Sequence, residues 1–106
     1  MARETNHLQD ISIITSVLSI KLGLPGCHSL KEKRGRIKPV LNQLRHEFNI
    51  SVAEVAFQDV WQSALLSCAV ISNNSAYNNQ LLSKVVSYLE QKFPDEQILD
   101  YQVESF

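Results

Sequence analysis

Residues 63–72 read SALLSCAVIS, a nearly continuous apolar run with LLSCAVI at its centre. A short apolar run bounded by polar turn residues is typical of a central strand that is buried on both faces. The preceding residues 51–58 alternate and predict a second strand, in which one face carries Ala53, Val55 and Phe57. The connection of residues 58–62 has the length of a hairpin, so we expect the two strands to pair antiparallel.

An alternating stretch and a basic amphipathic helix precede this hairpin. Residues 18–24 alternate apolar and polar side chains, which predicts the first strand. In the sequence SLKE, Ser29 accepts from the Glu32 N–H and Glu32 reaches back to the Ser29 N–H, a capping box that begins a helix. We expect a kink at Pro39 on the outer side of this helix and a left-handed cap at Asn49. Its apolar stripe comprises Leu30, Ile37, Leu41, Leu44 and Phe48.

A second amphipathic helix and a last strand follow the hairpin. The polar residues 72–75 supply a turn and an N-cap. The helix after them has an apolar stripe of Tyr77, Leu81, Val85, Leu89 and Phe93, with Leu82 and Val86 beside it. Residues 97–106 alternate again and predict a strand whose inward side chains are Leu99, Tyr101 and Val103.

The order of these elements is β-α-β-β-α-β, the split-βαβ or ferredoxin-like arrangement of the α+β class. Right-handed crossovers then give a four-stranded antiparallel sheet with both helices on one face. The usual strand order of this topology is 4-1-3-2, which places residues 63–72 inside the sheet.

Length and composition limit the class of protein. The chain has 106 residues, enough for one domain; we expect a flexible N-terminal tail at residues 1–10 and a single domain at 11–106. A formal net charge of −1 argues against a globally basic nucleic-acid binder. No apolar stretch is long enough to span a bilayer and no secretory signal is evident, so we expect a cytoplasmic protein with Cys27 and Cys68 reduced.

The most individual feature is a concentration of positive charge on the first predicted helix. Residues 28–46 contain six of the ten Lys and Arg residues and one acid, a net charge of +5, which leaves the rest of the chain at −6. At about 100° per residue, four of these cations fall within a strip about 60° wide beside the apolar stripe. We name this strip, formed by Lys31, Arg34, Lys38 and Arg45, the basic flank.

A strip of this kind is suited to follow a line of phosphates, which makes the basic flank a candidate site for nucleic acid or another anion. Two alternatives remain. The flank is a solvated helix surface whose charges pair with the acidic last strand or contact nothing, or it contacts a protein.

The predicted hairpin turn is a second candidate site. Asp59, Trp61 and Gln62 gather polar and aromatic groups there, and an exposed Trp commonly anchors a protein interface. The alternative is an ordinary turn in which Trp61 packs on the sheet edge and Asp59 bonds turn amides.

Catalytic and metal-binding patterns are absent from the sequence. The three histidines and two cysteines have no metal-ligand spacing, and no nucleophile is placed beside a base. We therefore expect a protein that is not an enzyme and that needs no cofactor or metal.

The open face of the predicted sheet lacks the features of a base-stacking platform. RNA-recognition domains of this topology stack bases on aromatic residues of the two central strands, and residues 63–72 contain none. A small, apolar sheet face of this kind often meets another subunit, so we expect a homo-oligomer, most simply a dimer, formed through the sheet.

Three segments together resemble the bacterial YlxP-like family, a family of unknown function. They are LPGCHSLKEKR (24–34), NISVAEVAFQDVWQSA (49–64) and the Ser72-Asn73 pair, and the resemblance covers roughly residues 14–104. It implies a ferredoxin-like fold and brings no known activity, substrate or catalytic residue. Family genes often lie near those for ribosome-binding factor A and translation initiation, which implies a role around RNA or the ribosome.

The chain also departs from the family pattern. Ser63 stands where an arginine commonly follows the WQ pair, and Pro39 and the ten-residue leader are unusual. From these observations we expect a non-enzymatic binding module that contacts RNA or a ribosome-associated partner through the basic flank. The alternative is an interaction module that oligomerises through its sheet face and uses the Trp61 hairpin as its partner site.

Overall fold

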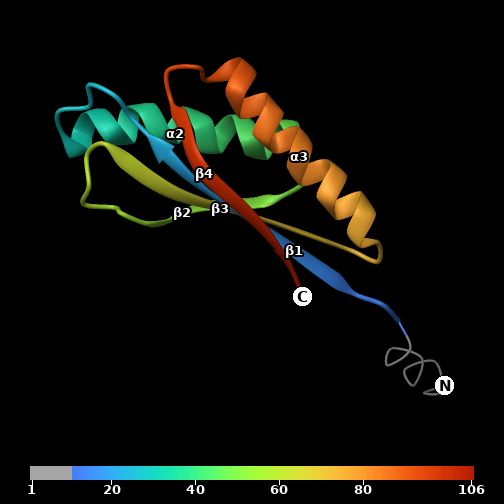
Figure 1. Cartoon of the computed structure of the whole chain (residues 1–106). Coiled ribbons are helices and arrows are strands. Elements are labelled where there is room, and N and C mark those ends of the chain that lie inside the picture. Colours follow the sequence, from blue (N-terminus) through green and yellow to red (C-terminus); the bar gives the residue numbers. More distant parts are fainter. Residues whose placement is uncertain (1–10) are drawn as a thin grey trace.

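Four strands and two helices make up the part of the chain that the computed structural model describes, residues 11–106. The predicted tail at residues 1–10 lies outside the described residues. The elements are β1 (Ile14–Gly23), α2 (Leu30–Glu47), β2 (Ser51–Ala56), β3 (Ser63–Ser72), α3 (Ser75–Lys92) and β4 (Gln97–Ser105). The strands form one antiparallel sheet in the order β2-β3-β1-β4, with both helices on one face (Figure 1). The ferredoxin-like prediction and its strand order are confirmed.

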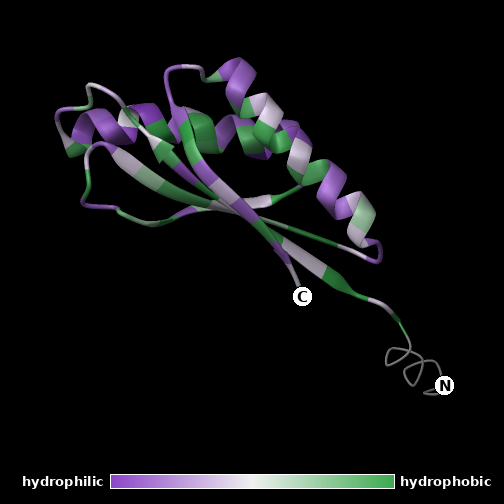
Figure 2. Cartoon of the chain, in the orientation of Figure 1, coloured by the Kyte–Doolittle hydropathy of each residue, from purple (hydrophilic) through white to green (hydrophobic). Residues whose placement is uncertain are grey.

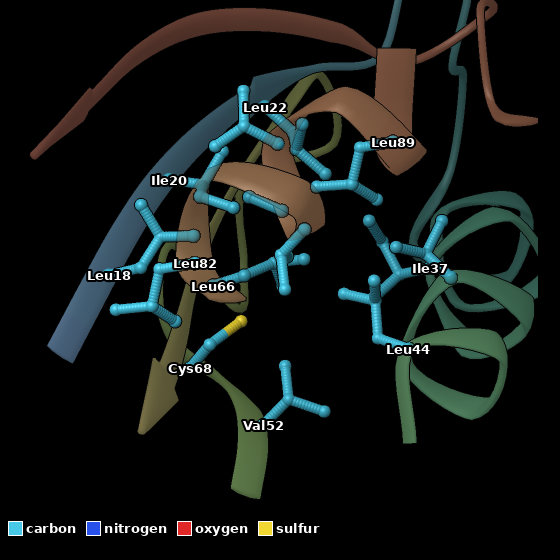
Figure 3. Close-up of a cluster of buried hydrophobic side chains, with 14 of the residues drawn as sticks. Leu18, Ile20, Leu22, Ile37, Leu44, Val52, Leu66, Cys68, Leu82 and Leu89 are labelled. Atoms are coloured by element: carbon cyan, nitrogen blue, oxygen red, sulfur yellow. The ribbon is translucent and has the colours of Figure 1, made fainter. Parts of the chain in front are cut away.

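The core lies between the sheet and the helices. Alternate residues of β1 and β3 point into it, because the side-chain period of a strand is two. Leu66 and Cys68 of β3 face Leu18 and Ile20 of β1 there, all fully buried (Figure 3). The helices complete the core with Ile37, Val40 and Leu44 from α2 and Leu82, Val85, Val86 and Leu89 from α3.

The opposite face of the sheet is open. Residues of β3 that point to it are half-buried, and Ile71 is 66% exposed. The prediction that β3 is buried on both faces is therefore wrong, because both helices cover the same side.

Hydrogen bonds cap helix α2 at both ends. Ser29 Oγ accepts from the Glu32 N–H at 3.0 Å, as predicted, but the Glu32 carboxylate accepts from the N–H of His28 at 2.8 Å and not from that of Ser29. The predicted left-handed cap at Asn49 is wrong: the helix ends because Phe48 turns to an extended conformation while its N–H still bonds to Leu44 O. Pro39 lies within the helix on its exposed side.

Helix α3 begins at the predicted polar turn but buries a different residue from the one expected. Asn74 caps it by accepting from the Tyr77 N–H at 3.1 Å. Tyr77 itself is 54% exposed, and the next residue, Asn78, is fully buried. The Asn78 amide is satisfied there by Ile14 O, Ser16 Oγ and Ser72 Oγ.

The second strand is shorter than predicted and turns a different face inward. The register of the pairing between β2 and β3 shifts between Glu54 and Ala56. The strand ends there because Phe57 adopts a positive φ of 65°. Val52 is the residue of β2 that faces the core, whereas Val55 is exposed.

The last strand also departs from the simple alternation. A register shift opposite Lys21 and Leu22 places the Leu99 side chain over Gly23 on the open face. Tyr101 and Val103 lie opposite core residues of β1 but stay largely exposed at the sheet edge. Ile98 packs against the core, and the predicted direction is wrong for Leu99. Tyr101 and Val103 point to the helix-covered side as predicted, but they are not buried.

Candidate nucleic-acid interface

The helix that carries the positive charge lies over one edge of the sheet. Helix α2 packs against the edge strand β2, whereas α3 packs against β1, β3 and β4. The N-terminal turns of α2 are predominantly hydrophilic (Figure 2). Six cations of this segment can therefore be sorted by what each side chain contacts.

Lys33 is used inside the protein. Its side chain is 2% exposed, and its Nζ lies 2.8 Å from Glu54 Oε2 and donates to the Phe57 carbonyl oxygen. The Phe57 carbonyl also accepts from the Val60 N–H, so the lysine holds the turn in which Phe57 takes its positive φ. A buried lysine requires such partners, because the charge loses its hydration. Its position could have been read from the sequence, since Lys33 lies one helical turn before Ile37 on the apolar stripe.

Arg36 is also used inside the protein. Its guanidinium bonds to Glu96 Oε1 at 2.7 Å through Nε, to Pro25 O at 2.7 Å and to Asp95 O at 3.1 Å. These contacts tie α2 to the loop before β4 and to the turn after β1. Two of the six cations are thus neutralised or occupied by internal partners.

The other four cations are those of the basic flank, and all of them are exposed. Among residues 11–106, none of the four forms an ion pair with a carboxylate. Arg45 donates to Val52 O at 2.9 Å, which turns it toward β2. The proposed pairing with the acidic last strand is wrong, because the flank lies along β2 and β4 is the opposite edge of the sheet.

A groove runs between the basic flank and β2. Its cavity of about 260 Å³ has Arg34, Lys38 and Arg45 along its wall, Ile37 and Leu41 as apolar lining, and Glu54 on the strand side. A neighbouring hollow of about 270 Å³ shares Arg34 and Glu54 and continues to Lys33, Gln58 and Asp59. Lys31 lines neither of them. Three of the four cations that helical spacing placed in one strip lie along this groove, whereas the groove itself and its strand side depend on tertiary contacts.

The candidate residues of the hairpin turn separate into three roles. Trp61 is 47% exposed. Asp59 lines the hollow beside Arg34. Gln62 is tied to the loop before α2, since its Nε2 donates to Cys27 O at 3.4 Å and its carbonyl accepts from the Leu24 N–H at 2.8 Å. Asp59 and Trp61 are therefore both exposed and, within residues 11–106, neither side chain forms such a bond.

Three further properties bear on function: the pKa of a buried thiol, the capacity to bind a metal ion and the capacity to cross a membrane. Burial raises the pKa of the Cys68 thiol to about 12. Within residues 11–106, no three His, Cys, Asp or Glu side chains come together as a metal site. Neither helix described has the length and apolar character needed to cross a bilayer.

These features define a ferredoxin-like α+β domain with a cationic helix beside an edge strand. Residues 15–103 match the model of the family described as "Protein of unknown function (DUF503)", and the chain belongs to this family. It is similar to "Uncharacterized protein YlxP" of Bacillus subtilis (strain 168), with 33% identity over 67 residues, 63% of this chain and 72% of the relative. The resemblance to the YlxP-like family is thereby confirmed.

Similar solved structures support the fold alone. The de novo designed protein Foldit4 matches with a TM-score of 0.50 and 10% identity, over 90% of this chain and 97% of that one. A weaker likeness joins the chain to LarC2, the C-terminal domain of a cyclometallase involved in the synthesis of the NPN cofactor of lactate racemase. Its TM-score is 0.38 and its identity 14%, over 88% of this chain and 56% of that one, and nothing is inferred from it.

Proposed function

We propose that this protein is a non-enzymatic binding module that contacts RNA, free or within the ribosome, through the basic flank. The observation that carries the proposal is the division of the cations of α2. Lys33 and Arg36 are held by internal partners, whereas Lys31, Arg34, Lys38 and Arg45 are exposed and form no ion pair within residues 11–106.

Unpaired cations in one line are what phosphate binding requires. Each phosphate contact releases condensed counterions, so a row of lysines and arginines supplies affinity that depends on salt. Because the rest of the chain has a net charge of −6, the local surface and not the overall charge would attract RNA. The family's gene context, named above as an implication of the resemblance, points the same way.

A titration of RNA at two salt concentrations tests the proposal. A labelled structured RNA is bound to the wild type and to Lys31→Gln/Arg34→Gln/Lys38→Gln, with fluorescence anisotropy as the readout. Loss of three contacts should weaken binding at low salt and reduce the magnitude of the log–log salt slope by about 2.

The control exchanges the same kind of charge on the other helix. Lys84→Gln/Lys92→Gln alters two exposed lysines of α3 and should leave most of the affinity and the slope. Absence of salt-dependent binding by the wild type, or equal losses in both variants, would refute the proposal.

A second candidate function rests on the open face of the sheet. Phe57, Ile71 and Leu99 expose large apolar side chains on that face, and Lys21 Nζ lies 5.7 Å from the centroid of the Phe57 ring. Exposed apolar surface of this kind is typical of protein interfaces. A homodimer formed through the two open faces would cover it.

Sedimentation over a range of concentrations tests this second candidate. The wild type should show a monomer–dimer equilibrium, and Ile71→Lys should shift it to the monomer because a charge would be buried at the interface. Tyr77→Lys, on exposed helix surface, serves as the control. A wild type that stays monomeric at every concentration would rule out the dimer.

A further inference from the structure

The two edges of the sheet differ in how their backbone groups are occupied. Strands β2 and β4 form these edges (Figure 1). On β2, Arg45 donates to Val52 O at 2.9 Å, and farther along Gln58 Nε2 donates to the carbonyl of Glu54 at 3.5 Å. This strand is also short and interrupted by a register shift. Such features keep an edge strand from pairing with another chain.

The edge of β4 is longer and its backbone faces outward. The strand has nine residues, and just beyond it Phe106 and Thr15 of β1 exchange hydrogen bonds of 2.8 and 3.1 Å. Hydrogen-bonded pairs alternate along an antiparallel ladder. Tyr101, Val103 and Ser105 therefore direct their N–H and C=O groups away from β1.

Two of these residues also expose apolar side chains. Tyr101 and Val103 point to the helix-covered side of the sheet but are 52% and 40% exposed, because no strand lies beyond β4 to cover them. Within residues 11–106, a side chain occupies one outward group: Asp100 accepts from the Tyr101 N–H at 2.9 Å. The unoccupied part of the edge therefore centres on Val103 and Ser105. A strand added there would satisfy this backbone and cover both apolar side chains.

We propose that a second copy of this chain adds to this edge, with the two β4 strands antiparallel and Val103 on the twofold axis. In this register Val103 faces Val103 of the second copy, and the two exchange both backbone hydrogen bonds. Ser105 faces Tyr101 of the second copy and donates its N–H to the Tyr101 carbonyl. The same patch of each copy thus meets itself, as a twofold interface requires.

The acidic residues of β4 select this register. Asp100, Gln102 and Glu104 alternate with the apolar residues and lie on the open face. An axis at Gln102 would set Asp100 opposite Glu104, and an axis at Glu104 would set two carboxylates opposite each other, which is destabilising. An axis at Tyr101 would bring together the two N–H groups that Asp100 already occupies. With the axis at Val103, Glu104 faces the neutral Gln102, so the strand complements itself.

This pairing leaves the candidate nucleic-acid interface of both copies uncovered. Helix α2 packs on β2 at the opposite edge, so the joined sheet would carry one basic flank at each end. The contact does not rest on RNA binding. It also differs from the face-to-face dimer considered above, because strands that share one sheet leave its open face free.

Sedimentation equilibrium of the full chain tests the pairing. A single strand pair buries less surface than a standard interface, so the measurements extend to about 1 mM protein, where the wild type should show a monomer–dimer equilibrium. Val103→Lys should raise the dissociation constant more than about tenfold, because it sets two like charges opposite each other on the axis. Val55→Lys, at a similarly exposed valine of the other edge strand, is the matched control and should change the dissociation constant less than about twofold.

Cysteine cross-linking tests the register. Val103→Cys places the two thiols on directly opposite residues, whose Cα atoms lie about 5.5 Å apart in such a pair, within the range of a disulfide. Tyr101→Cys is the matched control, because in this register its two copies are offset by about 14 Å along the strands. The native Cys27 and Cys68 are buried. Under mild oxidation a linked dimer should therefore form with Val103→Cys and not with Tyr101→Cys.

The outcomes separate the edge dimer from the alternatives. A wild type that stays monomeric up to about 1 mM refutes the inference. A dimer that withstands Val103→Lys and dissociates with Ile71→Lys is the face-to-face dimer, which also overturns it. Tyr101→Cys linking as fast as Val103→Cys would exclude the axis at Val103. Thermal unfolding checks that each variant is folded, and the cross-linking pair decides the question if Val103→Lys is not.

Discussion

Lys33 of helix α2 and Glu54 of strand β2 form an ion pair beside the candidate interface, with Nζ 2.8 Å from Oε2. The lysine is almost fully buried at 2% exposure and the glutamate is 21% exposed. Through the same Nζ, the lysine also holds the carbonyl of Phe57, whose backbone has the unfavourable positive φ of 65°. The pair therefore joins the helix, the edge strand and the turn that follows it.

Breaking this pair from one side should destabilise the protein. Lys33→Met leaves the Glu54 carboxylate without its counter-ion and the Phe57 carbonyl without its donor. We expect the free energy of unfolding to fall by about 2–3 kcal/mol, somewhat less than for a fully buried pair because Glu54 is partly solvated. Urea denaturation measures it. The double variant Lys33→Met/Glu54→Leu should recover at least half of the loss, and equal losses in the single and double variants would contradict this explanation.

Arg36 should not tolerate replacement by lysine. Its three bonds to Glu96, Pro25 O and Asp95 O require the forked guanidinium, and an ammonium group cannot reach all of them. Arg36→Lys should lower the free energy of unfolding by about 1–2 kcal/mol. The matched control is Arg34→Lys on the exposed flank, which should change it by less than about 0.5 kcal/mol. Similar effects of the two exchanges in urea denaturation would refute the assignment.

The buried side-chain amide of Asn78 should contribute to the stability of the fold, whereas that of its exposed neighbour Asn79 should not. Its side chain bonds to Ile14 O, Ser16 Oγ and Ser72 Oγ inside the protein, whereas Asn79 is exposed. Asn78→Ala leaves buried polar groups without partners and should reduce the free energy of unfolding by about 2 kcal/mol. The loss is measured as a lower midpoint of thermal unfolding. Asn79→Ala should leave it unchanged or raise it slightly, since alanine is the better helix former. A loss in both variants would show that the network does not stabilise the fold.

Cys68 should make the stability fall with pH in the alkaline range. Burial raises its pKa from the ordinary value of 9.0 to about 12, so the folded protein keeps the thiol proton that the unfolded chain releases above pH 9. The stabilisation that comes from the buried neutral thiol is therefore fully present below pH 9. Above that pH, the free energy of unfolding should fall by up to about 1.4 kcal/mol per pH unit. Urea denaturation of the wild type and of Cys68→Val between pH 8.5 and 10.5 measures how steeply the free energy of unfolding of each falls with pH. Identical slopes would exclude this thiol as their source.

Trp61 should be dispensable for stability. Its side chain is 47% exposed, and we expect Trp61→Ala to change the free energy of unfolding by less than about 1 kcal/mol. If the hairpin turn is a partner site, the same variant should lose specific proteins from a pull-down that the wild type retains. A partner list unchanged by Trp61→Ala would remove this residue from consideration as an interface anchor.

Most of the fold could be predicted because its signals are local. The alternation in residues 18–24, the apolar run of residues 63–72 and the capping residues Ser29 and Asn74 each depend on neighbours a few positions away. The errors fall where the sheet interrupts that regularity. Register shifts after Glu54 and beside Leu22 change which side chains of β2 and β4 face the core, and such shifts have no simple sequence pattern.

The candidate site was predicted only in part. Helical spacing placed Lys31, Arg34, Lys38 and Arg45 in one strip, and the structure leaves these four exposed along α2. The strand side of the groove, with Glu54 and the anchoring Lys33, could not be located because it depends on which edge of the sheet the helix covers. Asn78 was missed for a similar reason: its partners lie on β1 and at the end of β3.

The sequence by itself determined the order of the elements, the topology of the sheet and the concentration of positive charge in residues 28–46, because periodicity, capping and composition are properties of short segments. Only the tertiary structure decided which of those charges face solvent. Lys33 meets the Phe57 carbonyl 24 residues away, and Arg36 meets Glu96 60 residues away. Ion pairs and buried hydrogen bonds form between groups that folding brings together, so the division of α2 into structural cations and the exposed basic flank arises with the packing of the helix on the sheet.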